Sequence, residues 1–311
     1  MKQKEIGRTA FETYYTGLFA DEQQAAAFFA ALNTKKQPVL LVDPKNLPKL
    51  QKLWQEQGIT LTPLDWYPHA YLWPKEVPIN TPLPGYNEHL FYPLNASSLI
   101  PVQALSPKPG DYILDACAAP GGKSLAIANL LGDSHTLVAN DLSRSRRDRM
   151  KSIFTSHSKE IAVWGMMAEL ICKRSPEAFD KILLDAPCSS EAHIYTTPEE
   201  LTKWSHNRVI SLKKRQVGLL SGLWHALKPG GILVYSTCAV TPEENEWVIA
   251  TFLKKRKGEA ILIPWTAQTP GQLGIAGDYP AMLDLNSVRR IAVTEGELGP
   301  MFVAVLQKSG A

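Results

Sequence analysis

Cysteine is scarce in this 311-residue sequence, with only four residues, and no two of them have the spacing of a zinc knuckle. Four thiols are too few to cross-link a chain of this size, so we expect a reduced cytoplasmic protein without a metal site. Long apolar runs are also missing, because Pro and Gly interrupt the uncharged stretches. We therefore expect neither a secretion signal nor a membrane span.

A large excess of one charge is absent as well. The chain has 33 Lys+Arg and 30 Asp+Glu, which gives a net charge of +3. Contact with a polyanion would therefore require local basic patches rather than the whole surface. The hydrophobic content of 45% and the charged content of 20% are typical of a packed globular protein, and they exclude a disordered or collagen-like chain.

The amino-terminal part predicts a small α/β unit. Apolar residues recur at helical spacing over residues 9–32, which predicts two helices with Asp21 as the N-cap of the second. Residues 39–42 are typical of a short strand and are followed by another helical pattern. Prolines then crowd residues 63–84, which predicts an irregular bridge. We expect residues 1–100 to form this appendage with its proline-rich linker.

From Pro107 onward, predicted strands alternate with helices, which is typical of a mostly parallel sheet covered on both faces. A late pair, residues 287–293 and 302–306, leaves no room for a helix and predicts an antiparallel hairpin at the sheet edge. The fold class is therefore α/β, a doubly wound sheet within residues 101–311. The predicted parallel strands are 112–115, 136–139, 161–164, 181–184 and 232–235.

Ligands of an open α/β sheet bind beyond the carboxyl ends of its strands. The first strand ends at Asp115, and a turn of small residues then opens a helix at Lys123, which lets a ligand approach the backbone. The patterns GxGxxG and GxxxxGK[ST] are absent, so a dinucleotide fold or a P-loop is not indicated. Asp141 follows the second strand, where a carboxylate can accept both ribose hydroxyls of a nucleoside. A tight turn and a helix-capping Asp explain either feature equally well when taken alone.

Two cysteines follow two successive predicted strands. Cys188 comes three residues after Asp185, and Cys238 follows the next strand. If these strands are neighbours, about 4.8 Å apart, both thiols and the carboxylate lie over one edge of the sheet. Thr241 and Pro242 predict a helix start whose positive end lowers the pKa of a thiol. A lone buried cysteine is usually inert, but the paired placement favours a functional role.

Residues 114–124, 182–189 and 235–245 resemble the motifs of the Sun/Nop family of S-adenosylmethionine-dependent RNA cytosine-5 methyltransferases. The similarity extends through most of residues 90–307. It implies a Rossmann-like class I methyltransferase domain over residues 101–311, an RNA-binding role for the appendage, and S-adenosyl-L-methionine as cofactor. The cofactor contacts that it implies are Cys117, Ala118, Ala119, Pro120, Gly121, Gly122, Lys123, Asp141, Arg146, Met167 and Asp185.

The resemblance also implies the catalytic roles. Cys238 is the nucleophile, Cys188 the thiol that assists release, and Asp185 a carboxylate that touches cofactor and base. Carbon 5 of cytosine is a poor nucleophile, so a thiolate must first attack carbon 6. The sequence departs from the family at Met167, where relatives usually have an acidic residue for the adenine amino group; Met packs on adenine but accepts that hydrogen bond weakly.

The resemblance implies an RNA substrate, and we expect ribosomal RNA in preference to transfer RNA, with the chain acting as a monomer. Basic clusters, such as residues 144–151, suit a polyanion, although a solvated helix face explains them equally well. The weak motif at Met167 motivates an alternative, a weakly catalytic ribosome-assembly factor. DNA is disfavoured as a substrate because the predicted nucleophile follows the fifth strand, whereas DNA cytosine methyltransferases use the Pro-Cys after the fourth strand. Tyr195, Trp204 and Arg208 are candidates for a wall around a flipped base, and His193 is a candidate for contact with RNA. Core packing is the default expectation for Trp204, and a plain loop position is the default for His193.

Overall fold

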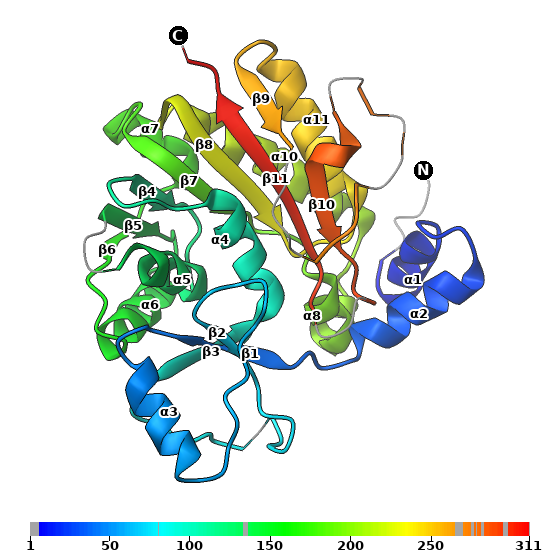
Figure 1. Ribbon diagram of the computed structural model, residues 1–311. Helices are drawn as coiled ribbons and strands as arrows, with labels where there is room; N and C mark the ends of the chain where they lie inside the picture. Colours follow the sequence, from blue (N-terminus) through cyan, green and yellow to red (C-terminus); the bar gives the residue numbers. More distant parts are fainter. Residues whose placement is uncertain are drawn as a thin grey trace.

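The computed structural model describes residues 6–79, 81–132, 136–264, 270–274, 277, 279–280, 283–294 and 298–310. Two β-sheets organise these residues, one of eight strands and one of three (Figure 1). Helices cover both faces of the larger sheet, and the smaller sheet lies at one end of the molecule. No helix among the described residues is both long enough and apolar enough to cross a bilayer.

The larger sheet has the order β10-β11-β8-β7-β4-β5-β6, and β9 pairs with β11 beside this path. The strands from β8 to β6 are parallel, whereas β11 is antiparallel to β8, β9 and β10. The doubly wound α/β class and the antiparallel edge pair are thus confirmed, and β9 is an addition that the sequence pattern did not predict. The strands are β4 (Tyr112–Asp115), β5 (Thr136–Asn140), β6 (Ala162–Trp164), β7 (Phe179–Asp185), β8 (Leu227–Thr237), β9 (Ala260–Ile263), β10 (Val288–Ile291) and β11 (Met301–Lys308).

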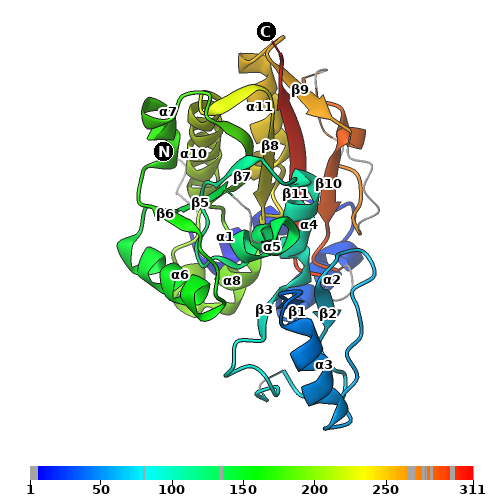
Figure 2. The same cartoon turned by 60° about the vertical axis from the view of Figure 1, so that its left-hand side comes forward.

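Successive residues of the central strands face two different cores, as the pleat of a strand requires. In β7, Leu183 packs with one core while Ile182 and Leu184 pack with the other. Helices α4, α5 and α6 contribute to the first core and α10 and α11 to the second, and Figures 1 and 2 show the two groups on opposite faces. The helices of this region are α4 (Ile100–Leu105), α5 (Gly122–Leu131), α6 (Arg144–Ser156), α7 (Ile171–Arg174), α8 (Glu191–Thr196), α9 (Pro198–Leu201), α10 (His206–Trp224) and α11 (Glu246–Lys255).

The smaller sheet is antiparallel with the order β2-β1-β3. Strand β2 lies inside the proline-rich segment that the sequence predicts to be irregular. It forms because residues 70–72 carry no proline and pair with β1. The four-residue 3-10 helix η1 (Ala96–Leu99) joins β3 to α4. The elements are α1 (Arg8–Thr16), α2 (Glu22–Leu32), β1 (Pro38–Val42), α3 (Leu47–Gln55), β2 (Ala70–Leu72) and β3 (Phe91–Asn95).

The first two helices form as predicted, and the Asp21 side chain caps α2 by accepting a 2.8 Å hydrogen bond from Gln24 N. The core in which they pack contains no residue of the small sheet, however. Phe11 and Tyr15 of α1 and Phe28 of α2 share a core with residues of α8 and the segment after it, and Figure 1 shows both helices beside α8. The amino-terminal helices therefore adjoin the larger sheet's loops in space.

Two glycines of α10 provide a matched test of how closely this helix packs against the backbone at Glu169. A Cβ on Gly222 would lie 2.3 Å from the backbone oxygen of Glu169, whereas a Cβ on Gly218 would meet nothing within 4 Å. We expect Gly222→Ala to lower the free energy of unfolding by about 1–3 kcal/mol through overpacking. Gly218→Ala should instead raise it by about 0.5–1 kcal/mol, as Ala does in a helix interior. Urea unfolding of both variants measures the difference, and equal effects would contradict the packing described.

Candidate active site

The ends of β7 and β8 bring two thiols together. The strands are parallel neighbours, with Asp185 paired to Ser236, so the adjacency expected from the doubly wound order is confirmed. Beyond these ends the Sγ atoms of Cys188 and Cys238 lie 3.1 Å apart. The Ser190 hydroxyl oxygen is 3.1 Å from the Cys238 sulfur and 3.5 Å from the Cys188 sulfur. Two thiols and a hydroxyl group thus lie within hydrogen-bonding distance of one another.

The two thiols differ in acidity. Hydrogen bonding to Cys188 lowers the pKa of Cys238 below its ordinary value, with help from Ser190 and against the effect of burial. The same contact with Cys238, together with burial, raises the pKa of Cys188 well above its ordinary value. Cys238 is therefore the thiol that ionises first, and Cys188 keeps its proton. This division favours Cys238 as a nucleophile, because the thiolate is the reactive form.

The expected helix start after Cys238 takes a different form. The Thr241 hydroxyl does accept a hydrogen bond from Glu244 N, at 3.3 Å, but the segment Pro242–Glu244 is a single 3-10 turn. The α-helix α11 begins only at Glu246. The prediction that a helix end lowers the pKa of Cys238 was therefore wrong in its cause, since the main contribution comes from Cys188.

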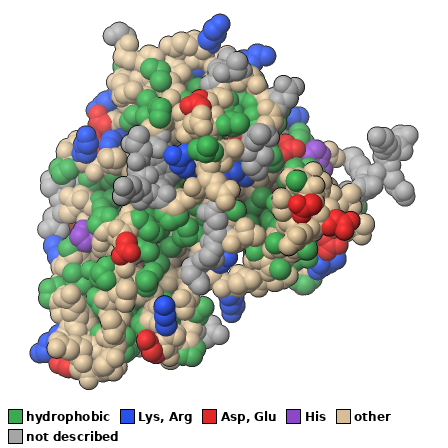
Figure 3. Space-filling view, turned by 45° about the vertical axis from the view of Figure 1, so that its right-hand side comes forward, with side chains coloured by type: hydrophobic (Ala, Val, Ile, Leu, Met, Phe, Trp, Pro, Cys, Tyr) green, Lys and Arg blue, Asp and Glu red, His purple; other side chains and the backbone are tan. Residues whose placement is uncertain are grey.

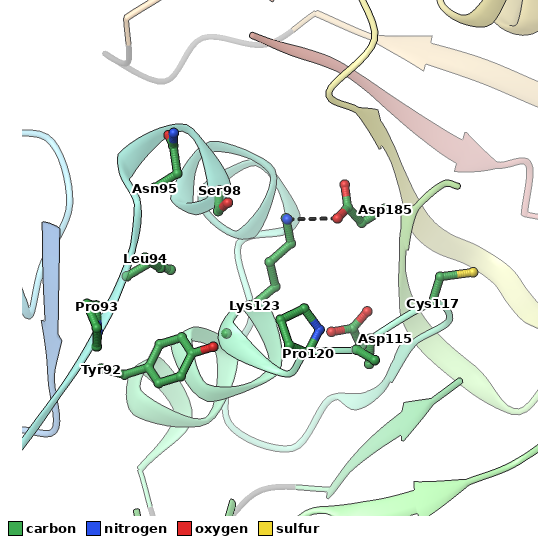
Figure 4. Close-up of a pocket in the computed structure, with 13 residues that line it drawn as sticks. Tyr92, Pro93, Leu94, Asn95, Ser98, Asp115, Cys117, Pro120, Lys123 and Asp185 are labelled. Atoms are coloured by element: carbon green, nitrogen blue, oxygen red, sulfur yellow. Dashed lines mark hydrogen bonds and ion pairs between the residues drawn. The ribbon is translucent and has the colours of Figure 1, made fainter. Parts of the chain in front are cut away.

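Asp185 is held by two donors at the end of β7. Lys123 Nζ lies 2.7 Å from Asp185 Oδ2, and the Ser236 hydroxyl donates to Oδ1 at 2.9 Å. Burial is the largest single effect on Lys123 and lowers its pKa, but the charge and hydrogen bond of Asp185 together with the charge of Asp115 outweigh it, so the pKa is raised and the ammonium form is stabilised. In Figure 4 the Lys123 side chain extends from the start of α5 to the Asp185 carboxylate. This ion pair joins the small-residue turn to the strand that leads to Cys188.

A cavity of about 280 Å³ lies against the small-residue turn (Figure 4). The turn leaves it open because its side chains are small, and a Cβ on Gly122 would already lie 2.9 Å from the Tyr92 ring. Gly121 does not line the cavity; with φ of 114° it supplies the left-handed turn before α5. The lining residues are Tyr92, Pro93, Leu94, Asn95, Ser98, Asp115, Cys117, Ala118, Ala119, Pro120, Gly122, Lys123 and Asp185.

Asp141 and Arg146 lie next to this turn but outside the lining of the cavity. Arg146 Nη1 pairs with Asp141 Oδ2 at 3.1 Å, and its Nη2 donates to the Ala119 carbonyl oxygen at 2.6 Å. The guanidinium group thus ties the end of β5 to the turn after β4. Met167 is 46% exposed after β6, and it lines neither this cavity nor the one beside Cys238.

A second cavity, of about 320 Å³, opens beside Cys238. It shares Asn95, Ser98, Lys123 and Asp185 with the first, so the two cavities are contiguous around the Lys123–Asp185 pair. The exposed His193 also lines it, and it lies in α8 rather than in the loop expected for it. The lining residues are Asn95, Ser97, Ser98, Lys123, Asp185, Ser190, Ala192, His193, Cys238, Gly299, Pro300 and Met301.

Asn95 and Ser190 were missed by the sequence analysis. Asn95 Oδ1 accepts hydrogen bonds from Ser97 N at 2.9 Å and Gly299 N at 3.3 Å, which joins the end of β3 to the segment before β11. A polar cap residue followed by an apolar helical run was a usable signal for Asn95. The position of Ser190 depends on its left-handed backbone, with φ of 55°, which no local pattern indicates.

The three residues predicted as a wall for a flipped base do not line either cavity. Trp204 is 1% exposed and meets Phe11 edge-on at 5.3 Å between ring centroids. Tyr195 stacks on Phe11 at 5.5 Å, and Arg208 pairs with Glu200 at 2.9 Å. The prediction of a wall was wrong because the amino-terminal helices pack against this segment, whereas the core packing expected by default for Trp204 is confirmed.

The fold and its loops define a class I methyltransferase domain of Rossmann type. The chain belongs to the family described as 16S rRNA methyltransferase RsmB/F, whose model matches residues 102–307. The predicted resemblance to the Sun/Nop family is thereby confirmed. Within the described residues, no three His, Cys, Asp or Glu side chains gather as a set of metal ligands.

The similar proteins include some named for ribosomal RNA and one named for transfer RNA. The chain is 36% identical over 213 residues to "Ribosomal RNA small subunit methyltransferase F" of Vibrio parahaemolyticus, covering 67% of this chain and 44% of the relative. It is 35% identical over 228 residues to "tRNA (cytosine(49)-C(5))-methyltransferase" of Pyrococcus abyssi, covering 72% of this chain and 73% of the relative. The chain thus spans less than half the length of the ribosomal relative.

Solved structures support the fold over nearly the whole chain. A methyltransferase homologue from Pyrococcus horikoshii has a TM-score of 0.80 at 27% identity and covers 96% of this chain and 94% of its own. NSun6 from the same organism, solved with SFG, has a TM-score of 0.81 at 21% identity and covers 97% and 98%. The second likeness shows the fold alone.

The buried carboxyl group of Asp115 predicts a pH dependence of stability. Asp115 is 1% exposed, and burial raises its pKa to about 7. An unfolded Asp titrates near ~3.9, so the stability that the protonated form confers is lost as the pH rises from about 4 through 7. Relative to wild type, Asp115→Asn should therefore gain roughly 3–4 kcal/mol between these limits.

Urea unfolding at several values between pH 4 and pH 8 measures this gain as the difference between variant and wild type. Taking the difference removes the constant effect of the amide and the titration of other groups. A difference that does not change over this range would contradict a raised pKa at Asp115.

Proposed function

We propose that the protein transfers a methyl group from S-adenosyl-L-methionine to carbon 5 of a cytidine in structured RNA through a covalent adduct on Cys238. The observation that carries this proposal is the 3.1 Å contact between Cys188 and Cys238 at a cavity that also holds Asp185. A target base in this cavity would meet the nucleophile Cys238 and the carboxylate of Asp185, and the second thiol lies 3.1 Å from the nucleophile. Ribosomal RNA is our first candidate for the substrate.

The residues present fit the proposed cofactor. Ala118, Ala119 and Gly122 leave the first cavity open, and Lys123 supplies a cation at its edge. Asp141 already accepts from Ser143 N and Arg146, yet a carboxylate has acceptor sites left for ribose hydroxyls. When bound, S-adenosyl-L-methionine supplies an electrophilic methyl group. The further contacts carried over from the family, including Pro120, Met167 and Arg146, belong to the same proposal.

The side chains divide the reaction into steps. The Cys238 thiolate forms a bond to carbon 6 of the base, which moves electron density onto carbon 5. Asp185 and its Lys123 partner stabilise the charge that develops on the ring. After methylation the carbon 5 proton must leave before the bond from Cys238 to carbon 6 can break. Cys188 assists this step by positioning a water that accepts the proton, or by accepting it itself once its own proton has passed to solvent, because its raised pKa keeps the thiol protonated beforehand.

The surroundings of the cavities suit a polyanion. Arg149 of α6 lines a groove that also includes Tyr92 and Pro93, two residues of the first cavity. β3 of the small sheet ends at Asn95 in the second cavity, which supports a role of residues 1–100 in RNA binding. On the face in Figure 3, basic, acidic and apolar side chains are interspersed, in keeping with the net charge of +3. We further propose that the protein acts as a cytoplasmic monomer.

Transfer RNA is the second candidate substrate, because the Pyrococcus abyssi relative named for it is covered over 73% of its length. Incubation with labelled cofactor and matched pools of ribosomal RNA, transfer RNA and DNA distinguishes these substrates, and bisulfite sequencing then locates the cytidine. Label in DNA alone would contradict the proposal. Calorimetric titration with S-adenosyl-L-methionine tests the alternative of a ribosome-assembly factor. If the cofactor does not bind, this alternative is favoured.

Cys238→Ala should abolish methyl transfer to RNA, because no other group in the second cavity can attack carbon 6 as a thiolate of lowered pKa. Binding of the cofactor should be unchanged, since Cys238 does not line the first cavity. Label transfer and calorimetry measure the two properties separately. Turnover at the wild-type rate by this variant would reverse the roles of the two cysteines.

Cys188→Ala should instead trap the reaction after methylation, since the base is still bonded to Cys238 while carbon 5 keeps its proton. We expect a covalent protein–RNA complex that survives denaturing electrophoresis and accumulates relative to wild type. Treatment with ribonuclease identifies the RNA in the shifted band. A variant that turns over normally without a shifted band would exclude Cys188 from the release step.

A further inference from the structure

The loop that carries Cys188 is held by two buried glutamates that the proposed chemistry does not use. Glu191 and Glu244 are both 0% exposed. Glu191 Oε1 accepts hydrogen bonds from the Tyr15 hydroxyl at 2.7 Å and from the Ser189 hydroxyl at 2.8 Å. A residue of the first helix therefore reaches the catalytic loop across 176 positions of sequence.

Glu244 fixes the same loop from the other side. Its Oε2 accepts from Ser189 N at 3.0 Å and from Gln216 Nε2 at 2.8 Å. The same Gln216 nitrogen also donates to the Pro187 carbonyl oxygen at 2.9 Å. The residues immediately before and after Cys188 are thus both anchored to this network, which limits where the thiol can point.

Burying two carboxyl groups with unpartnered oxygens costs free energy, which argues that this network has a functional role. Glu191 Oε2 and Glu244 Oε1 are buried without a hydrogen-bond partner among the described residues. Burial and the Glu191 charge raise the pKa of Glu244 to about 7. Ser190, which lies between Ser189 and Glu191, has a left-handed backbone with φ of 55°. Non-glycine residues adopt this conformation rarely, and such strain concentrates at functional sites.

We propose that Tyr15 is a positioning residue, which acts through Glu191 and Ser189 to hold the Cys188 sulfur and the Ser190 hydroxyl against the Cys238 sulfur. Helix α1 is then a working part of the site and not only a cover over α8. The catalytic meaning of this inference rests on the proposed function. The positions of the two sulfur atoms do not, so the inference has a test that needs no RNA.

Tyr15→Phe removes one oxygen atom from this network, and Tyr14→Phe is the matched control. Tyr14 is the neighbouring residue of α1, and its hydroxyl donates to Glu243 Oε2 at 2.7 Å, outside the Cys188 loop. The quantity to measure is the pH midpoint of Cys238 alkylation by iodoacetamide, resolved by peptide mass spectrometry. A midpoint reports the acidity of the thiol independently of its accessibility. The charged groups around Cys238, namely Asp185 of β7, Lys123 of α5 and Glu191 of α8, are retained in both variants.

We expect Tyr15→Phe to raise the midpoint by roughly half to one pH unit, because Cys238 loses hydrogen-bond donors to its thiolate. Tyr14→Phe should leave the midpoint at the wild-type value. Ser189→Ala removes the other donor to Glu191 Oε1, so it should shift the midpoint in the same direction. If thermal melting shows that Tyr15→Phe is unfolded, the Ser189→Ala variant replaces it in this measurement. Equal shifts in the two tyrosine variants, or no shift in Tyr15→Phe and Ser189→Ala, would overturn the inference.

A second readout connects the network to turnover. With RNA and cofactor, Tyr15→Phe should reproduce part of the Cys188→Ala behaviour, with several-fold more covalent complex than wild type and an unchanged KM for RNA. Tyr14→Phe should show the wild-type amount. Absence of methyl transfer by the wild-type protein would defeat the proposed function, while the alkylation midpoints would still decide whether Tyr15 positions the thiols.

Discussion

The site depends on the parallel pairing of β7 with β8. Because Asp185 is in register with Ser236, the two loops that follow begin side by side, and their cysteines meet with 3.1 Å between the sulfur atoms. A slip in this register would separate the thiols and move Asp185 away from Ser236. Sheet geometry that is general to the fold class therefore produces a contact that is specific to this chemistry.

The Lys123–Asp185 pair adds a second constraint. It stands where the two cavities meet, with the small-residue turn on one side and Cys238 on the other. Because the ammonium group holds the carboxylate from the α5 side, the end of β7 keeps its place between both cavities. Segments distant in sequence complete the enclosure, since Asn95 binds Gly299 N. The smaller sheet and the edge of the larger one are thus joined at the mouth of the site.

Much of this arrangement is predictable from sequence, because it follows from local periodicity and strand ends. The five parallel strands, the turn before Lys123 and the approach of the two thiols are of this kind. The position of the amino-terminal helices is not, since an amphipathic pattern says which face is buried and not what buries it. For that reason the sequence leaves Trp204 as a candidate for a base-binding wall, with core packing as the default, and only the structure identifies Phe11 as its aromatic partner.

Buried polar networks are the other part that sequence reasoning cannot reach. The sequence pattern singles out neither Glu191 nor Glu244 as buried, because charged residues are ordinarily solvated. Their burial depends on partners far along the chain, Tyr15 and Gln216, that no local pattern connects. The acidity of Cys238 has the same origin, since it is set by Cys188 and Ser190 rather than by a helix end.

The most direct test of the covalent centre uses RNA in which 5-fluorocytidine replaces cytidine, because fluorine cannot leave carbon 5 as a proton does. Incubation with S-adenosyl-L-methionine, followed by nuclease and protease digestion and mass spectrometry, identifies the side chain bonded to the base. The account predicts a methylated fluorocytidine nucleotide on the peptide that contains Cys238. The same nucleotide on the Cys188 peptide, or methylation of unmodified RNA with no covalent product from the fluorinated one, would contradict it.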